Sequence, residues 1–186
     1  MPHALKLISE PTPDLASTDE FTSAMSALAS GVVLVTCLVD GRPWGMTVTA
    51  FASVSTAPPT VLVSLGSRSI AARAIAATGR FGVSILAEEQ LAVARHGAAS
   101  GAPKFLDLLV DASGPRSATP AVADALAHLD CEVSTAVRAA DHIVFFGHVR
   151  AARTGAAAPP LLYHGRVYRT LAADPPTERS TRCRAN

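Results

Sequence analysis

The sequence has 186 residues, 49% of them hydrophobic, which suits a single domain with a sizeable apolar core. Its formal net charge is +1 and its 16 lysines and arginines are scattered, so nothing indicates a nucleic-acid-binding protein. The uncharged stretch 21–39 contains several serines and threonines and follows acidic residues, so we expect neither a membrane span nor a signal peptide.

The two ends and the cysteines bound the organisation of the chain. We expect a flexible arm over residues 1–17, one folded domain over 18–172 and a disordered tail over 173–186, because both ends are rich in proline. The three cysteines, Cys37, Cys131 and Cys183, have no metal-ligand spacing. Cys37 and Cys131 fall in apolar strand patterns, which is typical of free thiols in a reducing, cytoplasmic compartment.

Hydrophobic periodicity predicts an antiparallel, all-β dominated barrel with a few peripheral helices. In chain order, the predicted elements are a helix over 18–30, capped by Thr18 or Asp19, strands over 32–39, 46–55 and 61–65, a helix over 70–78, a strand over 81–86, a short helix over 88–95, strands near 129–135 and over 143–149, and a final strand that includes 167–171. The turn Asp40-Gly41 is a strong signal for a hairpin between the first two strands. No regular alternation of strand and helix occurs, so a parallel sheet is not expected.

The strand predicted over 46–55 has one face of small residues with hydroxyl groups. Its odd positions include Thr47, Thr49 and Ser53, which alternate with apolar residues on the other face. Hydroxyl-bearing residues are ordinary on the solvent side of a half-buried strand. They also allow a flat ligand to approach the backbone and hydrogen-bond to it, and the alternation alone leaves both interpretations open.

Two later segments contain candidate anion-binding and ligand-covering residues. Ser67, Arg68 and Ser69 precede the predicted helix 70–78, where free amides and a guanidinium favour an anion, although Ser67 is equally suited to simple capping. The segment 96–118 is rich in glycine, alanine, serine and proline around Lys104 and Phe105. Long irregular segments are often lids or binding loops, but a surface lysine beside an anchoring phenylalanine is the alternative.

Common catalytic motifs are absent from the sequence. It contains no GxGxxG after a strand, no GxxxxGK[ST], no HExxH and no GxSxG, which disfavours Rossmann, P-loop, zinc-protease and serine-hydrolase functions. Its six histidines are spread out without supporting carboxylate or cysteine clusters, so we expect no metal site. His142, beside Asp141, is either a hairpin residue or part of a site.

Several motifs in order resemble the short-chain flavin reductase family, the reductase components of two-component flavin-dependent monooxygenases. They are GMTVTAFASVS followed by a proline-containing turn and VLVSL, then GRFGVSIL, Lys104-Phe105, Asp141-His142 and PLLYHGRVYR, together spanning roughly residues 20 to 170. The resemblance implies an FMN-binding split β-barrel of antiparallel, Greek-key-like topology. It also implies a homodimer with flavin sites near the subunit interface.

The resemblance implies roles for individual residues. The flavin-binding residues would be Thr47, Thr49, Ala50 and Ser53 at the isoalloxazine and ribityl groups, Ser67, Arg68 and Ser69 at the phosphate, and Lys104 and Phe105 over the flavin. His142 is the implied catalytic residue, placing the nicotinamide with Asp141 and Tyr168, although Ala140 replaces the glycine that the family has before this pair. Tyr163, Arg166 and Tyr168 match the family's C-terminal motif, and packing at a sheet edge explains them equally well.

The implied reaction is hydride transfer from NADH, in preference to NADPH, to exchangeable FAD or FMN. Because the two cofactors supply the reacting atoms, positioning their rings about 3 to 3.5 Å apart requires no acid or base from the protein. The reduced flavin would reach a partner flavin-dependent monooxygenase by diffusion. Two alternatives stay open: a non-catalytic flavin-binding protein, and a flavoenzyme that retains its flavin and oxidises a small substrate.

Overall fold

The computed structural model describes residues 15–107, 109–111 and 119–171. The predicted tail over 173–186 and residues 1–14 of the predicted arm lie outside the described residues. None of the helices in the described part combines the length and apolar character needed to cross a membrane.

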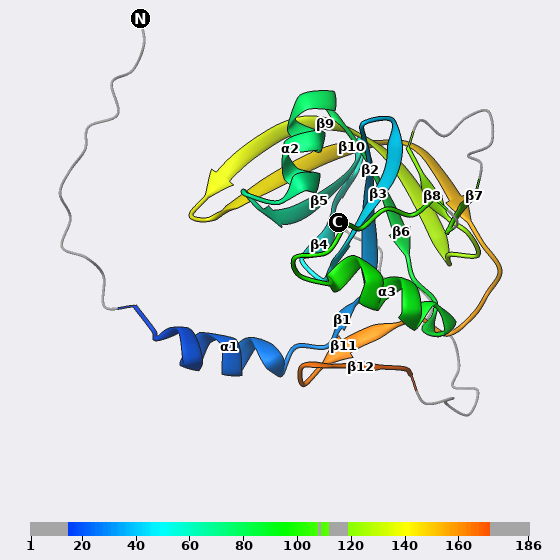
Figure 1. Cartoon of the computed structure of the whole chain (residues 1–186). Helices are drawn as coiled ribbons and strands as arrows, with labels where there is room; N and C mark the ends of the chain where they lie inside the picture. The colour runs from blue at the N-terminus through cyan, green and yellow to red at the C-terminus, as the bar shows by residue number, and fades with distance from the viewer. Residues whose placement is uncertain (1–14, 108, 112–118, 172–186) are drawn as a thin grey trace, which may run out of the picture.

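Seven strands form one antiparallel sheet in the order β3-β2-β6-β9-β10-β5-β4 (Figure 1). They are β2 (Val33–Val39), β3 (Arg42–Val48), β4 (Phe51–Thr56), β5 (Pro59–Gly66), β6 (Arg80–Ile85), β9 (Ala127–Ala139) and β10 (His142–Thr154). The edge strands β3 and β4 are joined only by Thr49 and Ala50, which reach about 7 Å when extended. An open sheet would separate its edges by roughly 29 Å, so this one must curl into a barrel.

The remaining elements are short helices and strands outside the seven-stranded sheet. They are α1 (Thr18–Ser26), β1 (Ser30–Gly31), α2 (Ile70–Thr78), the 3₁₀ turn η1 (Glu88–Gln90), α3 (Leu91–Ala98), β7 (Val110–Asp111), β8 (Ala121–Val122), β11 (Leu162–His164) and β12 (Val167–Arg169). Strands β1, β11 and β12 make a small second sheet, and β7 pairs with β8. In Figure 1, α1 extends away from the barrel beside this small sheet.

The antiparallel barrel and most of its elements are confirmed. Both residues of the β2–β3 turn have positive φ, 51° at Asp40 and 75° at Gly41, as a tight hairpin requires. Helix α2 covers the predicted residues, with Ser69 as its N-cap and Gly79 as a left-handed C-cap. The β9–β10 turn forms with Ala140 at φ 50°, so alanine adopts the left-handed conformation where glycine is the favoured residue.

The single strand predicted over 46–55 is wrong. Residues 46–48 end β3 and residues 51–55 belong to β4, at the opposite edge of the sheet. Alternation of side chains continues through a sharp bend at Thr49 and Ala50, so periodicity alone did not reveal the break. The N-terminal helix is also shorter than predicted, ending at Ser26, and its cap is Ser17, whose hydroxyl accepts from the Glu20 amide.

Two apolar clusters hold the barrel together. The first fills its interior and the inner face of α2, with Phe81, Phe145, Leu65 and Ile75 fully buried. The second lies under α3 and includes Leu34, Leu86, Leu106 and Leu161. Helix α3 approaches β3 closely because Gly97 has no side chain: a Cβ there would lie 2.9 Å from the Thr47 backbone nitrogen.

A buried polar network links β6, β9 and the segment before β8. His128 is only 5% exposed; its Nδ1 lies 3.0 Å from Ser84 Oγ and its Nε2 lies 3.3 Å from Thr119 Oγ1. Thr119 donates to Asp130, and Ser84 accepts from the Val122 amide. Burial, followed by the nearby charge of Arg153, lowers the pKa of His128 from 6.5 to about 4.

Candidate functional site

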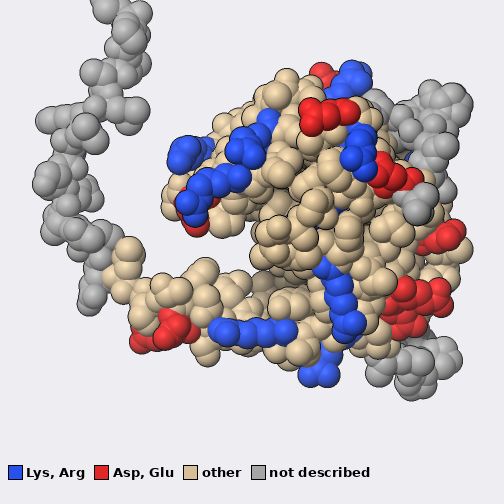
Figure 2. Space-filling model, in the orientation of Figure 1, with Lys and Arg blue, Asp and Glu red and all other residues tan. Residues whose placement is uncertain are grey.

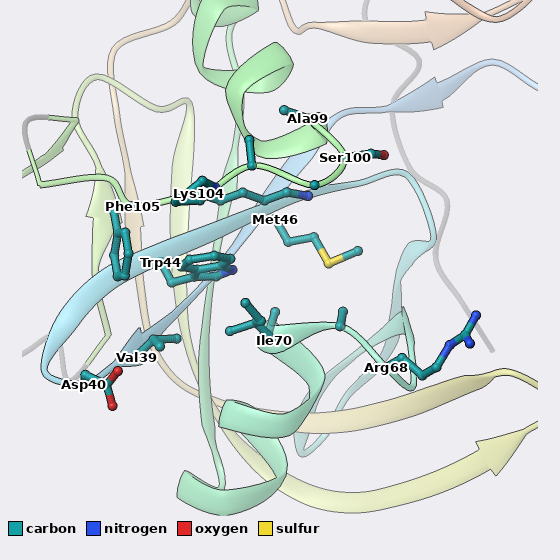
Figure 3. A pocket seen from close by; sticks show the side chains of 15 residues that line it. Val39, Asp40, Trp44, Met46, Arg68, Ile70, Ala99, Ser100, Lys104 and Phe105 are labelled. Carbon is teal, nitrogen blue, oxygen red and sulfur yellow. The ribbon is translucent and has the colours of Figure 1, made fainter.

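A cleft of about 1000 Å³ opens beside β3, between the start of α2 and the segment that follows α3 (Figure 3). We call it the β3–α2 cleft. Trp44 and Met46 of β3 form its floor, residues 68–71 at the start of α2 form one lip, and residues 99–105 form the other. Four predicted site residues meet here: Arg68, Ser69, Lys104 and Phe105.

The lip that carries Phe105 is fastened to β3 by backbone hydrogen bonds. The Gly45 amide donates to the Lys104 carbonyl and the Leu106 amide donates to the Pro43 carbonyl, both at 3.0 Å. The Phe105 ring meets Trp44 edge to face, with centroids 4.9 Å apart. The guanidinium carbon of Arg42 lies 3.8 Å from the centroid of the Phe105 ring, and the same guanidinium pairs with Asp107. These contacts hold the Phe105 end of the lip against β3.

Cationic and amide groups lie on both lips of the cleft. The Ser69 hydroxyl accepts from the Ala72 amide and the Ser69 amide donates to the Gly66 carbonyl, so Ile70 and Ala71, which line the cleft, carry the first α2 amides without an intrahelical partner. In Figure 3 the Lys104 side chain extends along the opposite lip, and Arg68 projects from the loop before α2. Partial burial lowers the pKa of Lys104 below its usual value. Amides, a guanidinium and an ammonium around one opening favour an anion.

The β9–β10 turn brings Asp141 and His142 beside the same loop. The Ser67 amide donates to the Asp141 carbonyl at 2.8 Å, and His142 pairs with Gly66 across the sheet. His142 Nδ1 lies 2.7 Å from Asp141 Oδ1. This hydrogen bond to His142 holds the pKa of Asp141 below its usual value, with a smaller contribution from Arg68. Asp141 thereby fixes the orientation of a half-exposed imidazole.

The predicted isoalloxazine residues do not share one surface. The Thr47 hydroxyl donates to the Ala94 carbonyl of α3 at 2.6 Å, so it packs a helix instead of facing the cleft. Thr49 and Ala50 line a separate pocket of about 340 Å³ beside α1, and Ser53 is exposed on β4. The expectation of a continuous hydroxyl face is therefore wrong. Ala50 nevertheless lies close to the strand that leads into the loop 67–69. Its carbonyl accepts from the Ser64 amide of β5, two residues before Gly66.

Tyr168 lies on the small sheet, away from Asp141 and His142. Its ring contacts Tyr163 edge to face, with centroids 5.3 Å apart, and it shares a pocket with Arg95 of α3. Burial and the neighbouring Tyr163 raise the pKa of Tyr168. Tyr163 and Arg166 also line the pocket beside α1, where Arg166 donates to the Thr22 hydroxyl. Tyr163 and Arg166 therefore separate the pocket lined by Tyr168 from the pocket lined by Thr49 and Ala50.

Sequence comparison identifies the family. The model of the flavin reductase like domain matches residues 25–172, which is most of the chain. The chain belongs to this family.

Named relatives agree with the assignment to the flavin reductases. The chain is 37% identical over 147 residues to the reductase component of a 4-nitrophenol 4-monooxygenase/4-nitrocatechol 2-monooxygenase from Rhodococcus opacus, covering 79% of this chain and 78% of the relative. It is 35% identical over 169 residues to a flavin reductase (NADH) from Kitasatospora aureofaciens, covering 90% and 88%. Among solved structures, BorF, the flavin reductase component of a bacterial two-component tryptophan halogenase, superposes with a TM-score of 0.78 at 32% identity, covering 85% of this chain and all of BorF.

Several cleft residues of this flavin reductase were not predicted from the sequence. Trp44 and Met46 lie at even positions of β3, on the face opposite the hydroxyl-bearing side chain of Thr47 that was predicted to contact the flavin. Trp44 is the sole tryptophan of the chain, and its place next to a hairpin turn was a usable signal. No group of three or more potential metal ligands occurs among the described residues.

Proposed function

We propose that the chain is an NADH-dependent flavin reductase that reduces exchangeable FAD or FMN and releases the reduced flavin to a separate flavin-dependent monooxygenase. The observation that carries this proposal is that Arg68, Ser69 and Lys104, in a chain of the flavin reductase family, converge on one cleft. A phosphorylated flavin has the anionic group that such a cleft accommodates.

The phosphate would bind at the start of α2. The Ile70 and Ala71 amides, which have no partner within the helix, would donate to the phosphate, while Arg68 and Lys104 would supply the compensating charge from the two lips. Ser67 supports this arrangement indirectly, because its amide is committed to Asp141 and fixes the loop. Phe105 closes the cleft on the side that faces Arg42.

The ring of the flavin would then lie outside the cleft, over the β3–β4 connection and the end of β5. Thr49, Ala50 and Ser53 supply backbone and small side chains there, and Thr47 contributes by holding α3 against β3. Flavin accepts a hydride, two electrons and one proton, from the reduced nicotinamide. Asp141 and His142 would place the nicotinamide, while Tyr168 would contribute from the small sheet.

We further propose a homodimer that acts in the cytoplasm. Helix α1 buries none of its residues: its Phe21 and Met25, and Leu28 just beyond its end, are between 46% and 60% exposed. Figure 2 shows this helix projecting from the body of the protein. A second copy would cover this apolar surface and complete the ring site next to Thr49. Free buried Cys37 and Cys131 suit a reducing compartment.

The test is steady-state NADH oxidation by the purified chain with added FMN or FAD. The proposal expects turnover that depends on added flavin, with NADH used in preference to NADPH. Absence of flavin-dependent NADH oxidation would refute it. Tight flavin binding without turnover would identify a non-catalytic flavin-binding protein, and stoichiometric flavin that survives gel filtration without exchange would identify an enzyme that retains its flavin.

A further inference from the structure

Three exposed arginines lie beside the start of α2. Arg68 belongs to the loop before this helix, Arg73 to the helix itself and Arg138 to the end of β9. Figure 2 shows Lys and Arg side chains gathered over α2 and the β9–β10 turn, at the left of the view. We call these three residues the arginine group. Because the formal net charge of the whole chain is only +1, the group is a local concentration of positive charge.

The sheet register and the helix geometry bring the arginine group together. Arg138 pairs with Ile143 of β10, which pairs on its other side with Leu65 of β5. Neighbouring strands lie about 4.8 Å apart, so the Cα atom of Arg138 is roughly 10 Å from that of Leu65, three residues before Arg68. Arg73 lies about 4.5 Å along the axis of α2 from its first residue. The three charges therefore act together on a molecule that approaches the start of α2.

The protein itself neutralises little of this charge. Neither Arg73 nor Arg138 forms a side-chain hydrogen bond or ion pair with another described residue. Asp141, in the β9–β10 turn, is the neighbouring acid. The hydrogen bond with His142 lowers the pKa of Asp141, and the charge of Arg68 lowers it further. Asp141 thus offsets one of the three positive charges, and the other two face solvent.

The proposed function requires rapid capture of flavin, because an exchangeable flavin must be taken from solution in every turnover. FMN and FAD carry negatively charged phosphate groups, and a cationic surface beside a binding site raises the rate at which an anion arrives. Residues that act in this way need not contact the bound ligand. Arg68 lines the β3–α2 cleft, whereas Arg73 and Arg138 do not.

We propose that Arg73 and Arg138 steer phosphorylated flavins toward the start of α2, accelerating association without holding the bound flavin. This inference rests on the proposed function for the position of the phosphate. Two positive charges about 10 Å from a doubly charged phosphate raise its arrival rate roughly 5- to 10-fold at about 10 mM salt. At about 1 M salt the Debye length is only about 3 Å, so the advantage disappears.

The test measures FMN association and dissociation by stopped-flow flavin fluorescence in the absence of NADH. It compares the wild type with two double variants, Arg73→Gln with Arg138→Gln, and Arg150→Gln with Arg153→Gln. The second pair is the matched control: it removes the same charge from exposed arginines of β10 that lie roughly 25 to 35 Å along the strand from His142.

At about 10 mM salt, the first double variant should bind FMN roughly 5- to 10-fold more slowly than the wild type, with an unchanged dissociation rate. The control variant should associate as the wild type does. At about 1 M salt the three association rates should agree. Riboflavin, which lacks the phosphate, should associate equally fast with all three proteins at either salt concentration.

The contrary outcomes would each overturn the proposal. Equal FMN association rates for all three proteins at low salt would show that the arginine group does not steer, and equal slowing in the control would assign the effect to net charge. Faster dissociation at an unchanged association rate would make Arg73 or Arg138 a contact of the bound flavin. Failure of the proposed function is distinguishable, because it would appear as no NADH oxidation while FMN still associates at a salt-dependent rate.

Discussion

Acidification should destabilise the fold through His128, which is buried in the polar network between β6 and β9. Its pKa falls from 6.5 to about 4, chiefly because burial disfavours the charged imidazolium. The unfolded chain takes up a proton as the pH drops below about 6.5, whereas the folded chain resists it until about 4. Stability contributed by neutral His128 is thus complete above 6.5 and is lost as the pH falls to 4.

The loss amounts to about 3 kcal/mol in the free energy of unfolding, at about 1.4 kcal/mol for each pH unit. Urea unfolding of the wild type and His128→Gln over this pH range measures it. The variant should be less stable at neutral pH, because Ser84 and Thr119 lose a hydrogen-bonding partner. The difference between the two proteins should shrink as the pH falls.

His164→Gln is the matched control, since His164 is exposed on β11, outside the hydrogen-bond network that holds His128. If the wild type and His128→Gln lose stability in parallel between pH 6.5 and 4, the account of a buried neutral imidazole is wrong.

Three further predictions concern the site and the contact that supports it. Ser53→Tyr should abolish flavin-dependent turnover by filling the ring site, whereas Ala52→Tyr, at an exposed position on the other face of β4, should not. Unchanged kinetics in folded Ser53→Tyr would place the ring elsewhere. Lys104→Met should raise the KM for FMN about 10-fold by removing a charge-assisted contact to phosphate, and an equal rise with riboflavin, which lacks phosphate, would disprove that role. Gly97→Ala should lower the free energy of unfolding by about 1 to 3 kcal/mol, because the added Cβ meets the Thr47 backbone. Gly31→Ala is the control, since a Cβ there meets open space. Similar urea midpoints for the two variants would contradict that packing.

The elements with strong local signals were predictable from the sequence. Asp40-Gly41 fixes its hairpin because both residues tolerate positive φ, and Ser69 with Gly79 bounds α2 because a cap and a left-handed terminus are local features. The family resemblance likewise came from the order of short motifs, each tied to a strand or turn.

What depends on tertiary structure was not predictable in the same way. The bend at Thr49 and Ala50 sends β3 and β4 to opposite edges of the sheet, and nothing in the alternation marks it. Thr47 had the right chemistry for a ligand contact, but the approach of α3 at Gly97 uses its hydroxyl internally. The cleft was missed because its floor, Trp44 and Met46, becomes visible only when the lip 99–105 pairs with β3.

The most direct test of the central claim is anaerobic reduction of flavin by NADH, with FAD or FMN in large molar excess over the protein. If the chain positions exchangeable flavin for hydride transfer and then releases it, nearly all of the added flavin should lose its oxidised absorbance, with one NADH consumed for each flavin. Bleaching that stops at one flavin for each chain, or that proceeds no faster than without protein, would contradict the account.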